Sequence, residues 1–243
     1  QFAGARRRVV TLAPPDFRLD PAELADAVSD RTRMILLNSP HNPTGRVLTR
    51  DELEAVARLA REHDLIVVTD EVYEHLIFEG RHIPLCTLAP EHTLTISSLS
   101  KSYAFTGWKT GWASGPAHLV GAARTVKQFL SFAGGTPFQH AAAVALGLDT
   151  EPLRKELQQS RDLLAGGLEA AGFDVLAPQA TYFLNVDVHA DAVEFCKRLV
   201  PERGVVAIPT SVFYDSDVGD SLVRFAFCKR PDVIAEAARR LGS

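Results

Sequence analysis

Polar side chains gather where three short apolar runs of this sequence end, and their types are those of an enzyme site. They comprise two amides, a carboxylate, a phenol, two hydroxyls and one amine, at Asn38, Asn42, Asp70, Tyr73, Ser97, Ser98 and Lys101. Ligands of an open α/β sheet bind beyond the carboxyl ends of its strands. We therefore expect these side chains to face one site.

A lysine in such company indicates carbonyl chemistry. An amine becomes nucleophilic where its surroundings disfavour the ammonium form, and it then forms Schiff bases. A carboxylate such as Asp70 suits a pyridoxal ring, because it keeps the ring nitrogen protonated and the ring an electron sink. A phenol and an amide can donate hydrogen bonds to the ring oxygen, and hydroxyls beside a cation suit a phosphate. These residue types favour a pyridoxal 5'-phosphate site.

A strand–helix–strand unit is predicted to position the first of these groups. Residues 34–37 and 65–68 are continuous apolar runs, typical of parallel strands buried on both faces. Between them, residues 49–52 form a capping box that opens an amphipathic helix. Further strands are expected at 93–96 and 111–114, and helices at 21–28, 117–132, 139–148 and 151–171.

The pattern changes after Gly172, which suits the end of the long helix. Short strands are expected at 175–176, 182–188, 205–208 and 222–227, with one helix at 190–199 and another closing the chain. The change predicts two domains, a larger one over residues 1–150 and a smaller α+β domain over residues 151–243.

Composition excludes several classes of protein. The 243 residues are 46% hydrophobic and carry a net charge of −4, so disorder, collagen and electrostatic binding of nucleic acid are not expected. No apolar run approaches the ~20 residues that cross a bilayer, so no membrane partner is expected. The three widely spaced cysteines favour a reducing, cytoplasmic location over a disulfide framework or a metal site. Fingerprints of dinucleotide, P-loop and α/β-hydrolase sites are missing.

Four blocks in this order resemble those of fold-type I, class I/II pyridoxal-phosphate aminotransferases. They are residues 38–45 (NSPHNPTG), 70–73 (DEVY), 98–101 (SLSK) and 106–112 (TGWKTGW). The 28 positions from Asn42 to Asp70 also match the family. The resemblance implies an α/β fold: a three-layer αβα large domain with a mostly parallel sheet, and a smaller C-terminal α+β domain. The sequence looks most similar to the kynurenine, glutamine and methionine aminotransferase branch and to actinobacterial N-succinyldiaminopimelate aminotransferases.

The resemblance assigns catalytic roles to three residues. Lys101 would hold the cofactor as a Schiff base and move the proton between the substrate Cα and the cofactor. Asp70 would pair with the pyridine nitrogen. Tyr73 would contact the ring oxygen together with Asn42, which also borders the substrate.

The resemblance assigns the remaining candidates to anion binding. Ser98 and Lys109 would bind the cofactor phosphate, with Lys109 where many relatives carry arginine. Arg224 would grip the substrate α-carboxylate. From the residues alone, Arg224 could equally be satisfied by a structural carboxylate.

The implied activity is transfer of an amino group from an amino acid to a 2-oxo acid by a ping-pong route, in a cytoplasmic homodimer. Two alternatives stay open from the blocks alone: a C–S β-lyase on the same scaffold, and a non-catalytic effector-binding domain. Members of the family also carry an N-terminal portion before the point that matches Gln1, and it completes the cofactor pocket. We therefore expect this chain to associate through its exposed apolar surface and to bind the cofactor weakly.

Overall fold

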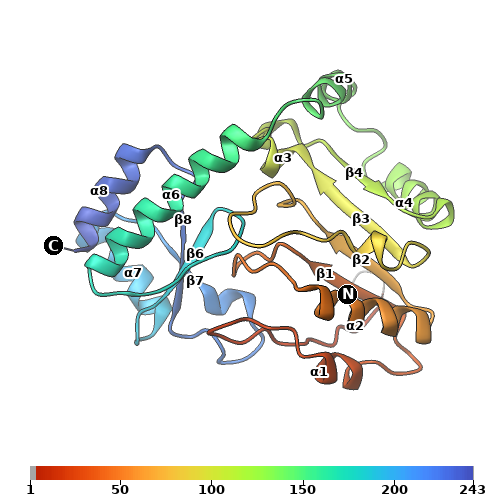
Figure 1. Cartoon of the computed structure of the whole chain (residues 1–243), viewed down its shortest axis with the longest axis horizontal. Helices are drawn as coiled ribbons and strands as arrows, with labels where there is room; N and C mark the ends of the chain where they lie inside the picture. The colour runs from red at the N-terminus through yellow and green to blue at the C-terminus, as the bar shows by residue number, and fades with distance from the viewer. Residues whose placement is uncertain (1–3, 243) are drawn as a thin grey trace.

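The computed structural model describes residues 4–242, so residues 1–3 and 243, at the outer limits of the two predicted domains, lie outside the described part. Two four-stranded sheets organise the chain (Figure 1). The first has the order β1-β2-β3-β4, with β1 (Met34–Asn38), β2 (Ile66–Asp70), β3 (Thr93–Ser98) and β4 (Gly111–Ser114). The second has the order β5-β6-β8-β7, with β5 (Asp174–Leu176), β6 (Phe183–Asp187), β7 (Ile208–Pro209) and β8 (Leu222–Ala226).

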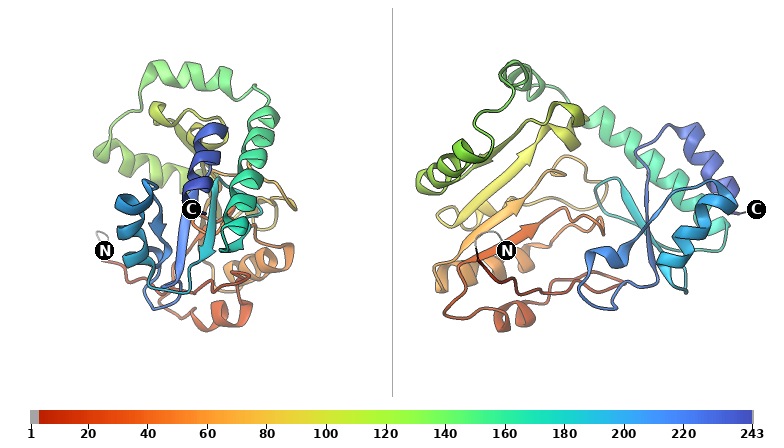
Figure 2. Two further views of the ribbon diagram at one scale, coloured as in Figure 1. Left: turned by 90° about the vertical axis from the view of Figure 1, so that its left-hand side faces the viewer. Right: turned by 180° about the vertical axis from the view of Figure 1, so that it is seen from behind.

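Helices flank both sheets. The α-helices are α1 (Pro21–Asp26), α2 (Arg50–Glu62), α3 (Leu99–Ser102), α4 (Ala117–Leu130), α5 (Thr136–Ala145), α6 (Glu151–Ala170), α7 (Ala192–Arg203) and α8 (Pro231–Leu241). Short 3₁₀ turns cover Leu85–Thr87, Thr106–Trp108 and Thr210–Phe213. Figures 1 and 2 show α1 and α2 at the β1 side of the first sheet, and α4 and α5 at its β4 side. No described helix is both long and apolar enough to cross a membrane.

The register of the first sheet brings its strand ends to one edge. Strands β1, β2 and β3 are parallel, with Asn38 opposite Asp70 and Asp70 opposite Ile96. Strand β4 is antiparallel to β3 and places Gly111 opposite Ser98. The mixed, parallel-containing α/β sheet agrees with the predicted fold class.

Helix α2 forms as its sequence predicts. The Thr49 hydroxyl accepts from the Glu52 amide, and the Glu52 carboxylate accepts from the Thr49 amide at 2.8 Å, which completes the capping box. Its apolar stripe, with Leu53 and Val56, is buried against Val67 of β2. This packing fixes the β1–α2–β2 unit that carries the first strand ends.

A second core joins the two halves of the chain. Leu164 and Leu168 of α6 pack with Phe225 of β8, and Tyr73 and Leu76 from the first half belong to the same cluster. Backbone hydrogen bonds reinforce the contact between the halves, including Ala180 to Gly45 and Thr181 to Leu76, at 2.8 and 3.0 Å. The loops after β1 and β2 are thus held by the second half.

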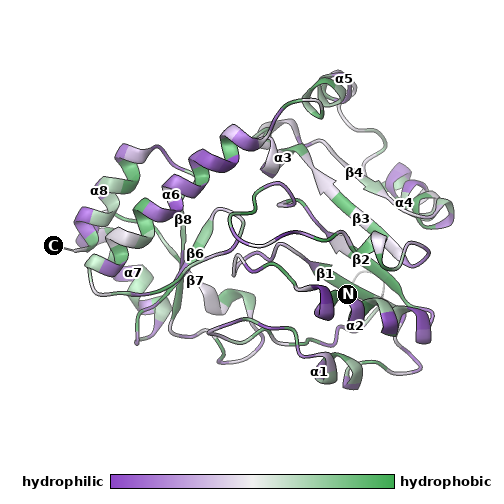
Figure 3. Cartoon of the chain, viewed as in Figure 1, coloured by the Kyte–Doolittle hydropathy of each residue, from purple (hydrophilic) through white to green (hydrophobic). Residues whose placement is uncertain are grey.

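Two sequence predictions differ from the structure. Of the predicted strand 205–208 only Ile208 is in β7. Strand β1 is not buried on both faces: Met34 and Leu36 are 52% and 76% exposed, since no described segment covers that face. Apolar exposure extends to α5, largely hydrophobic in Figure 3, where Val144 is 73% exposed.

Candidate functional site

Asn38 ties together the loops that follow β1 and β2. Its side-chain amide donates to the carbonyl of Asp70 at 2.8 Å, and its side-chain oxygen accepts from the amide of Asn42 at 2.8 Å. The end of β2 and the 39–45 loop are therefore fixed relative to each other. Sequence reasoning placed Asn38 at the site edge, and the structure shows it as the connecting residue.

Asp70 ends β2 with a half-buried carboxylate. One carboxylate oxygen accepts from the Val72 amide at 3.2 Å. Burial is the largest influence and raises the pKa of Asp70; the Val72 hydrogen bond and Lys101 oppose it, and Glu71 adds to it. The ionised carboxylate is thus incompletely compensated in the free protein, and it would be stabilised by a further cationic or N–H partner.

Tyr73 lies three residues on, in a tight turn, and is 2% exposed. Its ring meets that of Tyr182 edge to face, with 5.4 Å between the ring centres. Burial raises the pKa of Tyr73, and Tyr182 raises it further, while Arg224 opposes the rise. The phenol is therefore neutral at physiological pH and able to donate a hydrogen bond.

Lys101 projects from the single turn of α3, which begins immediately after β3. Ser98 caps this turn by accepting from the Ser100 amide at 3.3 Å, and the Ser102 hydroxyl donates to the Val72 carbonyl at 3.0 Å. The Lys101 ammonium is 5.8 Å from the centre of the Tyr182 ring. Within residues 4–242 this ammonium has no hydrogen-bond or ion-pair partner, which leaves it available to a ligand.

Arg224 reaches the same region from the middle of β8. Its guanidinium donates to the side-chain oxygen of Asn42 at 2.7 Å, and lies 4.1 and 4.8 Å from the ring centres of Phe183 and Phe213. Burial lowers the pKa of Arg224, and the tyrosines Tyr73 and Tyr182 oppose that change.

No described carboxylate pairs with Arg224, although the residue is only 8% exposed. The structural alternative raised by the sequence, an internal carboxylate partner, is therefore not what the described residues show. A buried guanidinium without an anion, flanked by aromatic rings, is suited to bind a carboxylate ligand in a bidentate manner.

Ser98 and Lys109 differ in how closely they join this cluster. Ser98 is linked to Lys101 through α3, and it lies opposite Gly111 in the sheet. Lys109 is exposed, has a left-handed backbone at φ +53°, and makes no side-chain hydrogen bond or ion pair with any described residue. The structure thus brings together Asn42, Asp70, Tyr73, Lys101 and Arg224, with Ser98 beside them, and leaves Lys109 at the rim.

Sequence reasoning missed two contributors, Tyr182 and Asn185. Asn185 is fully buried in β6; its amide donates to the Pro43 carbonyl at 2.9 Å and its oxygen accepts from the Thr210 hydroxyl at 2.7 Å. A lone amide in the otherwise apolar residues 183–186 was the available signal, because a buried amide requires partners.

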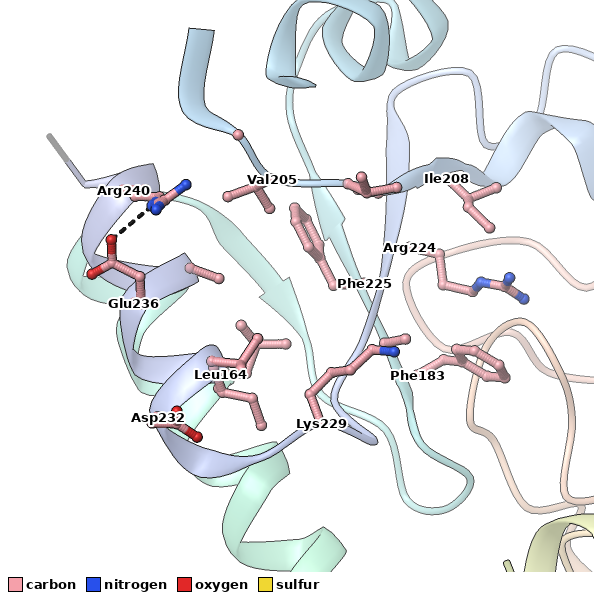
Figure 4. A pocket seen from close by; sticks show the side chains of 17 residues that line it. Leu164, Phe183, Val205, Ile208, Arg224, Phe225, Lys229, Asp232, Glu236 and Arg240 are labelled. Atoms are coloured by element: carbon pink, nitrogen blue, oxygen red, sulfur yellow. Dashed lines mark hydrogen bonds and ion pairs between the residues drawn. The ribbon is translucent and has the colours of Figure 1, made fainter. Parts of the chain in front are cut away.

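A cavity of about 630 Å³ lies between β8, the segment of residues 204–208 and helices α6 and α8 (Figure 4). Its lining is largely apolar, with Leu164, Val205 and Phe225 among the labelled residues, and Arg224 lies at its border with the guanidinium pointing away from Arg240. The cavity does not include Lys101, Asp70 or Tyr73. The polar cluster, rather than this cavity, carries the reactive groups.

Comparison with known proteins identifies the family. The sequence profile described as aminotransferase class I and II matches residues 1–241, and the chain belongs to this family. It is 49% identical to the probable N-succinyldiaminopimelate aminotransferase DapC of Mycobacterium tuberculosis, covering 99% of this chain and 66% of that protein. It is 38% identical to the methionine aminotransferase of Escherichia coli, covering 99% of this chain and 65% of that protein.

Solved structures agree with this assignment. The N-succinyldiaminopimelate aminotransferase of M. tuberculosis superposes with a TM-score of 0.94 at 50% identity, covering 99% of this chain and 66% of that one. A Thermus thermophilus aspartate aminotransferase variant gives a TM-score of 0.87 at 35% identity, covering 93% of this chain and 64% of that one. The chain spans just under two thirds of the length of the curated relatives it matches.

The family depends on pyridoxal phosphate, and the polar cluster fits that group. A half-buried carboxylate that lacks a full counter-charge, a neutral phenol and an unpaired half-buried lysine are the partners that a pyridine nitrogen, a ring hydroxyl and an aldehyde require. Asp70, Tyr73 and Lys101 therefore form a donor and acceptor set that matches the cofactor's chemistry.

Proposed function

We propose that this protein is a pyridoxal-phosphate-dependent aminotransferase that moves an amino group from an amino acid to a 2-oxo acid by a ping-pong route. The observation that carries the proposal is the meeting of Lys101, Asp70 and Tyr73 with the carboxylate-binding candidate Arg224 in one cluster. Bound there, pyridoxal phosphate would supply an aldehyde that accepts the amino group and a ring that takes up electrons. No contact among the described residues favours the lyase or the effector-binding alternative.

The residues of this chain would divide the work as follows. Lys101 would attach the cofactor and carry a proton at its Nζ atom. The Asp70 carboxylate would hold a proton on the ring nitrogen by its negative charge. The Tyr73 hydroxyl and the Asn42 amide would orient the ring through its oxygen.

Anion binding would fall to three other side chains. Ser98 and Lys109 would bind the phosphate, and the exposed position of Lys109 at the rim is compatible with contact to a charged group. Arg224 would bind the substrate α-carboxylate, and its hydrogen bond to Asn42 would set the distance between substrate and ring. This arrangement would hold the reacting atoms close, and positioning of that kind accounts for a large share of catalysis.

Fold and assembly complete the proposal. We expect residues 1–150 to belong to a three-layer αβα large domain and residues 151–243 to a smaller C-terminal α+β domain. We also expect a cytoplasmic homodimer. The exposed apolar residues of α4 and α5, such as Phe129 at 83%, support an association of this kind.

A substrate panel tests the activity. The protein would be incubated with pyridoxal phosphate, 2-oxoglutarate and one amino donor at a time, starting with N-succinyldiaminopimelate, methionine and kynurenine, the compounds that relatives' names indicate. Formation of glutamate that requires both substrates and disappears in Lys101→Ala supports the proposal. Release of pyruvate or a thiol without need for a 2-oxo acid would contradict it and indicate a lyase.

A further inference from the structure

The turn that carries Asp70 and Tyr73 has a second polar side. Within residues 70–76 the Glu74 amide donates to the Glu71 carbonyl at 2.9 Å, so the turn is tightly wound. In such a turn, residues three apart share a side. Asp70 and Tyr73 face the candidate site, and Glu71 and Glu74 form a separate pair of carboxylates.

The carboxylate of Glu71 is buried against His82. Glu71 is 2% exposed, and its Oε2 atom is 2.8 Å from Nε2 of His82, whose side chain is 9% exposed. The other ring nitrogen, Nδ1, is buried and has no hydrogen-bond partner within residues 4–242. An N–H at that position would be an unsatisfied buried donor, so the geometry favours an imidazole that carries its proton on Nε2 and donates it to Glu71.

Glu74 is held from the neighbouring strand. The hydroxyl of Ser97 in β3 donates to Oε1 of Glu74 at 2.6 Å. The oxygen and nitrogen atoms of Glu71, Glu74 and His82 lie within 4.8 Å of one another. Two carboxylates at this distance repel each other, so each depends on its own donor to remain in place.

We propose that His82 is a positioning residue: by donating a hydrogen bond to buried Glu71, it holds the 70–76 turn so that Asp70 and Tyr73 present their polar atoms to the cofactor. This role rests on the proposed function for its catalytic meaning, but the ordering of the turn does not depend on it. His82 follows Phe78 by four residues. The Phe78 amide donates a hydrogen bond to the Gln179 carbonyl in the second half of the chain, at 2.8 Å. The pair therefore links the site turn to a segment that the second half of the chain holds.

Loss of the donor has a defined physical consequence. Without His82, the Glu71 carboxylate would be buried and unpaired, and the turn would have to open to let water reach it. Opening would move Asp70 and Tyr73, which lie one and two residues away from Glu71. A glutamine at position 82 would keep a donor nitrogen for Glu71, whereas leucine would not.

Three variants test the proposal: His82→Leu, His82→Gln and, as a matched control, His92→Leu. His92 is also partly buried, but it contacts the Leu65 carbonyl at 3.1 Å, away from the turn. Hydrogen–deuterium exchange of peptides covering residues 70–76 would be measured in the cofactor-free protein, with residues 183–187 of β6 as an internal reference. The Kd for pyridoxal phosphate would be measured by absorbance in the same proteins.

We expect His82→Leu to raise exchange in residues 70–76 at least tenfold relative to β6 and to weaken cofactor binding at least tenfold. His82→Gln should recover most of both properties, and His92→Leu should leave both near the wild-type values. The hydrogen–deuterium exchange of residues 70–76 could change in the His82 variants as expected while the wild-type protein does not bind pyridoxal phosphate. In that case the positioning role stands and the proposed function fails.

Three results would overturn the proposal. The first is wild-type exchange and Kd in His82→Leu. The second is equal damage in His82→Gln and His82→Leu, which would mean that the donor is not what matters. The third is protection of the wild-type turn only after addition of Zn²⁺ or Mn²⁺, lost in both His82 variants, which would make the cluster a metal site.

Discussion

The guanidinium of Arg224 and the side-chain oxygen of Asn42 share a 2.7 Å hydrogen bond across 182 positions of sequence. Asn42 belongs to the loop after β1 and Arg224 to β8, so one contact joins the candidate ring-binding loop to the candidate substrate-binding strand. Asn185 repeats this link by donating to the Pro43 carbonyl at 2.9 Å. In the proposed function, these direct bonds between the two halves would set the distance between substrate and cofactor.

Arg224→Lys keeps the positive charge but loses the planar guanidinium that can bind a carboxylate through two parallel hydrogen bonds. We expect kcat/KM for amino acids to fall roughly 10- to 100-fold, the equivalent of one charge-assisted hydrogen bond of about 1.5–3 kcal/mol, while the Kd for pyridoxal phosphate stays unchanged. Steady-state kinetics and an absorbance titration check the two quantities. Arg230→Lys, an exposed arginine paired with Asp232, serves as the control.

The opposite result would reassign Arg224. If cofactor affinity falls sharply in Arg224→Lys and kcat/KM follows only because the cofactor is lost, the guanidinium belongs to the phosphate site. Arg224 has no carboxylate partner among the described residues, which is compatible with binding of either anion, so this comparison is decisive.

Lys101 should be the residue that becomes covalently attached to the cofactor. Its ammonium is half-buried, 5.8 Å from the Tyr182 ring centre, and has no acid partner among the described residues. Borohydride treatment of the cofactor-loaded protein, followed by peptide mass mapping, should place the pyridoxyl mass on Lys101. A label on exposed Lys109 or Lys127 would contradict the assignment.

Asp70→Asn should separate stability from function. Burial raises the pKa of Asp70 above its ordinary value of 3.8, so the folded state holds this proton more tightly than the unfolded state. At pH values above the pKa of Asp70 in the folded protein, the ionised carboxylate therefore lowers the free energy of unfolding. This free energy rises again as the pH falls through that pKa and the carboxylate takes up its proton. We expect Asp70→Asn to be more stable than wild type at neutral pH, by a margin that shrinks in acid.

The same substitution should reduce kcat at least ~100-fold, because the ring nitrogen loses its counter-charge. Urea denaturation of the cofactor-free protein at neutral and acidic pH checks the stability, and turnover checks the function. A variant that is less stable than wild type at neutral pH, or that has near-normal kcat, would mean that Asp70 is a structural cap and another acid serves the ring.

Local sequence signals predicted the elements that depend on nearby residues. Helix α2 could be predicted because Thr49 and Glu52 cap it within one turn, and β4 could be predicted from its own four residues. Of the strand expected at 205–208 only Ile208 pairs with β8, because a strand also needs a partner, which the local apolar pattern does not specify. The strand-end candidates were selected because they follow predicted strands, whereas Lys109, Arg224 and the roles of all the candidates came from the resemblance to a known family.

The missed contributors depend on contacts that no local pattern encodes. Asn185 is a site residue only because Pro43, 142 positions away, presents its carbonyl to it. His82 matters only because the chain returns its imidazole to Glu71. In both cases the signal is a buried polar group whose partner is visible only in the folded chain.

Glu52→Gln should destabilise the β1–α2–β2 unit strongly. Glu52 is bound by Arg46 at 2.8 Å, and the two side chains are only 5% and 11% exposed. Burial alone would raise the pKa of Glu52, but the hydrogen bonds from Arg46, Thr49 and Leu19 outweigh it and lower the pKa below 4.5. Removing one partner of a buried pair costs about 3–5 kcal/mol.

The pH dependence of Glu52→Gln follows from the lowered pKa. The Glu52 carboxylate contributes its full stability above its pKa in the unfolded chain and loses it as the pH falls through its pKa in the folded protein. The difference in free energy of unfolding between wild type and Glu52→Gln should therefore become smaller only at acidic pH. Urea denaturation over a pH series measures this gap. Glu54→Gln, whose pair with Arg50 is more than half exposed on both sides, should change stability by less than ~1 kcal/mol. Equal losses at both positions would contradict the role given to Glu52.

Gly45→Ala should uncouple the 39–45 loop from the second half of the chain. Gly45 has φ +72°, and an added Cβ would overlap the Cβ of Pro178 and lie 2.9 Å from the Ala180 carbonyl oxygen. The left-handed backbone costs a non-glycine residue roughly 1–2 kcal/mol, and crowding against fixed backbone adds about 1–3 kcal/mol. The hydrogen bond from the Ala180 amide to the Gly45 carbonyl, 2.8 Å, would be strained at the same time.

Gly80→Ala is the matched control for this prediction. Gly80 has nearly the same φ, +78°, but an added Cβ would meet no atom of the described residues within 4 Å. Gly80→Ala should therefore lose only the conformational part, about 1–2 kcal/mol, and keep the wild-type affinity for an amino acid substrate. Gly45→Ala should lose more stability and also bind substrate more weakly, because the loop that it displaces carries Asn42, the partner of Arg224. Equal unfolding free energies for the two variants in urea would show that the approach of Pro178 to Gly45 does not hold the halves together.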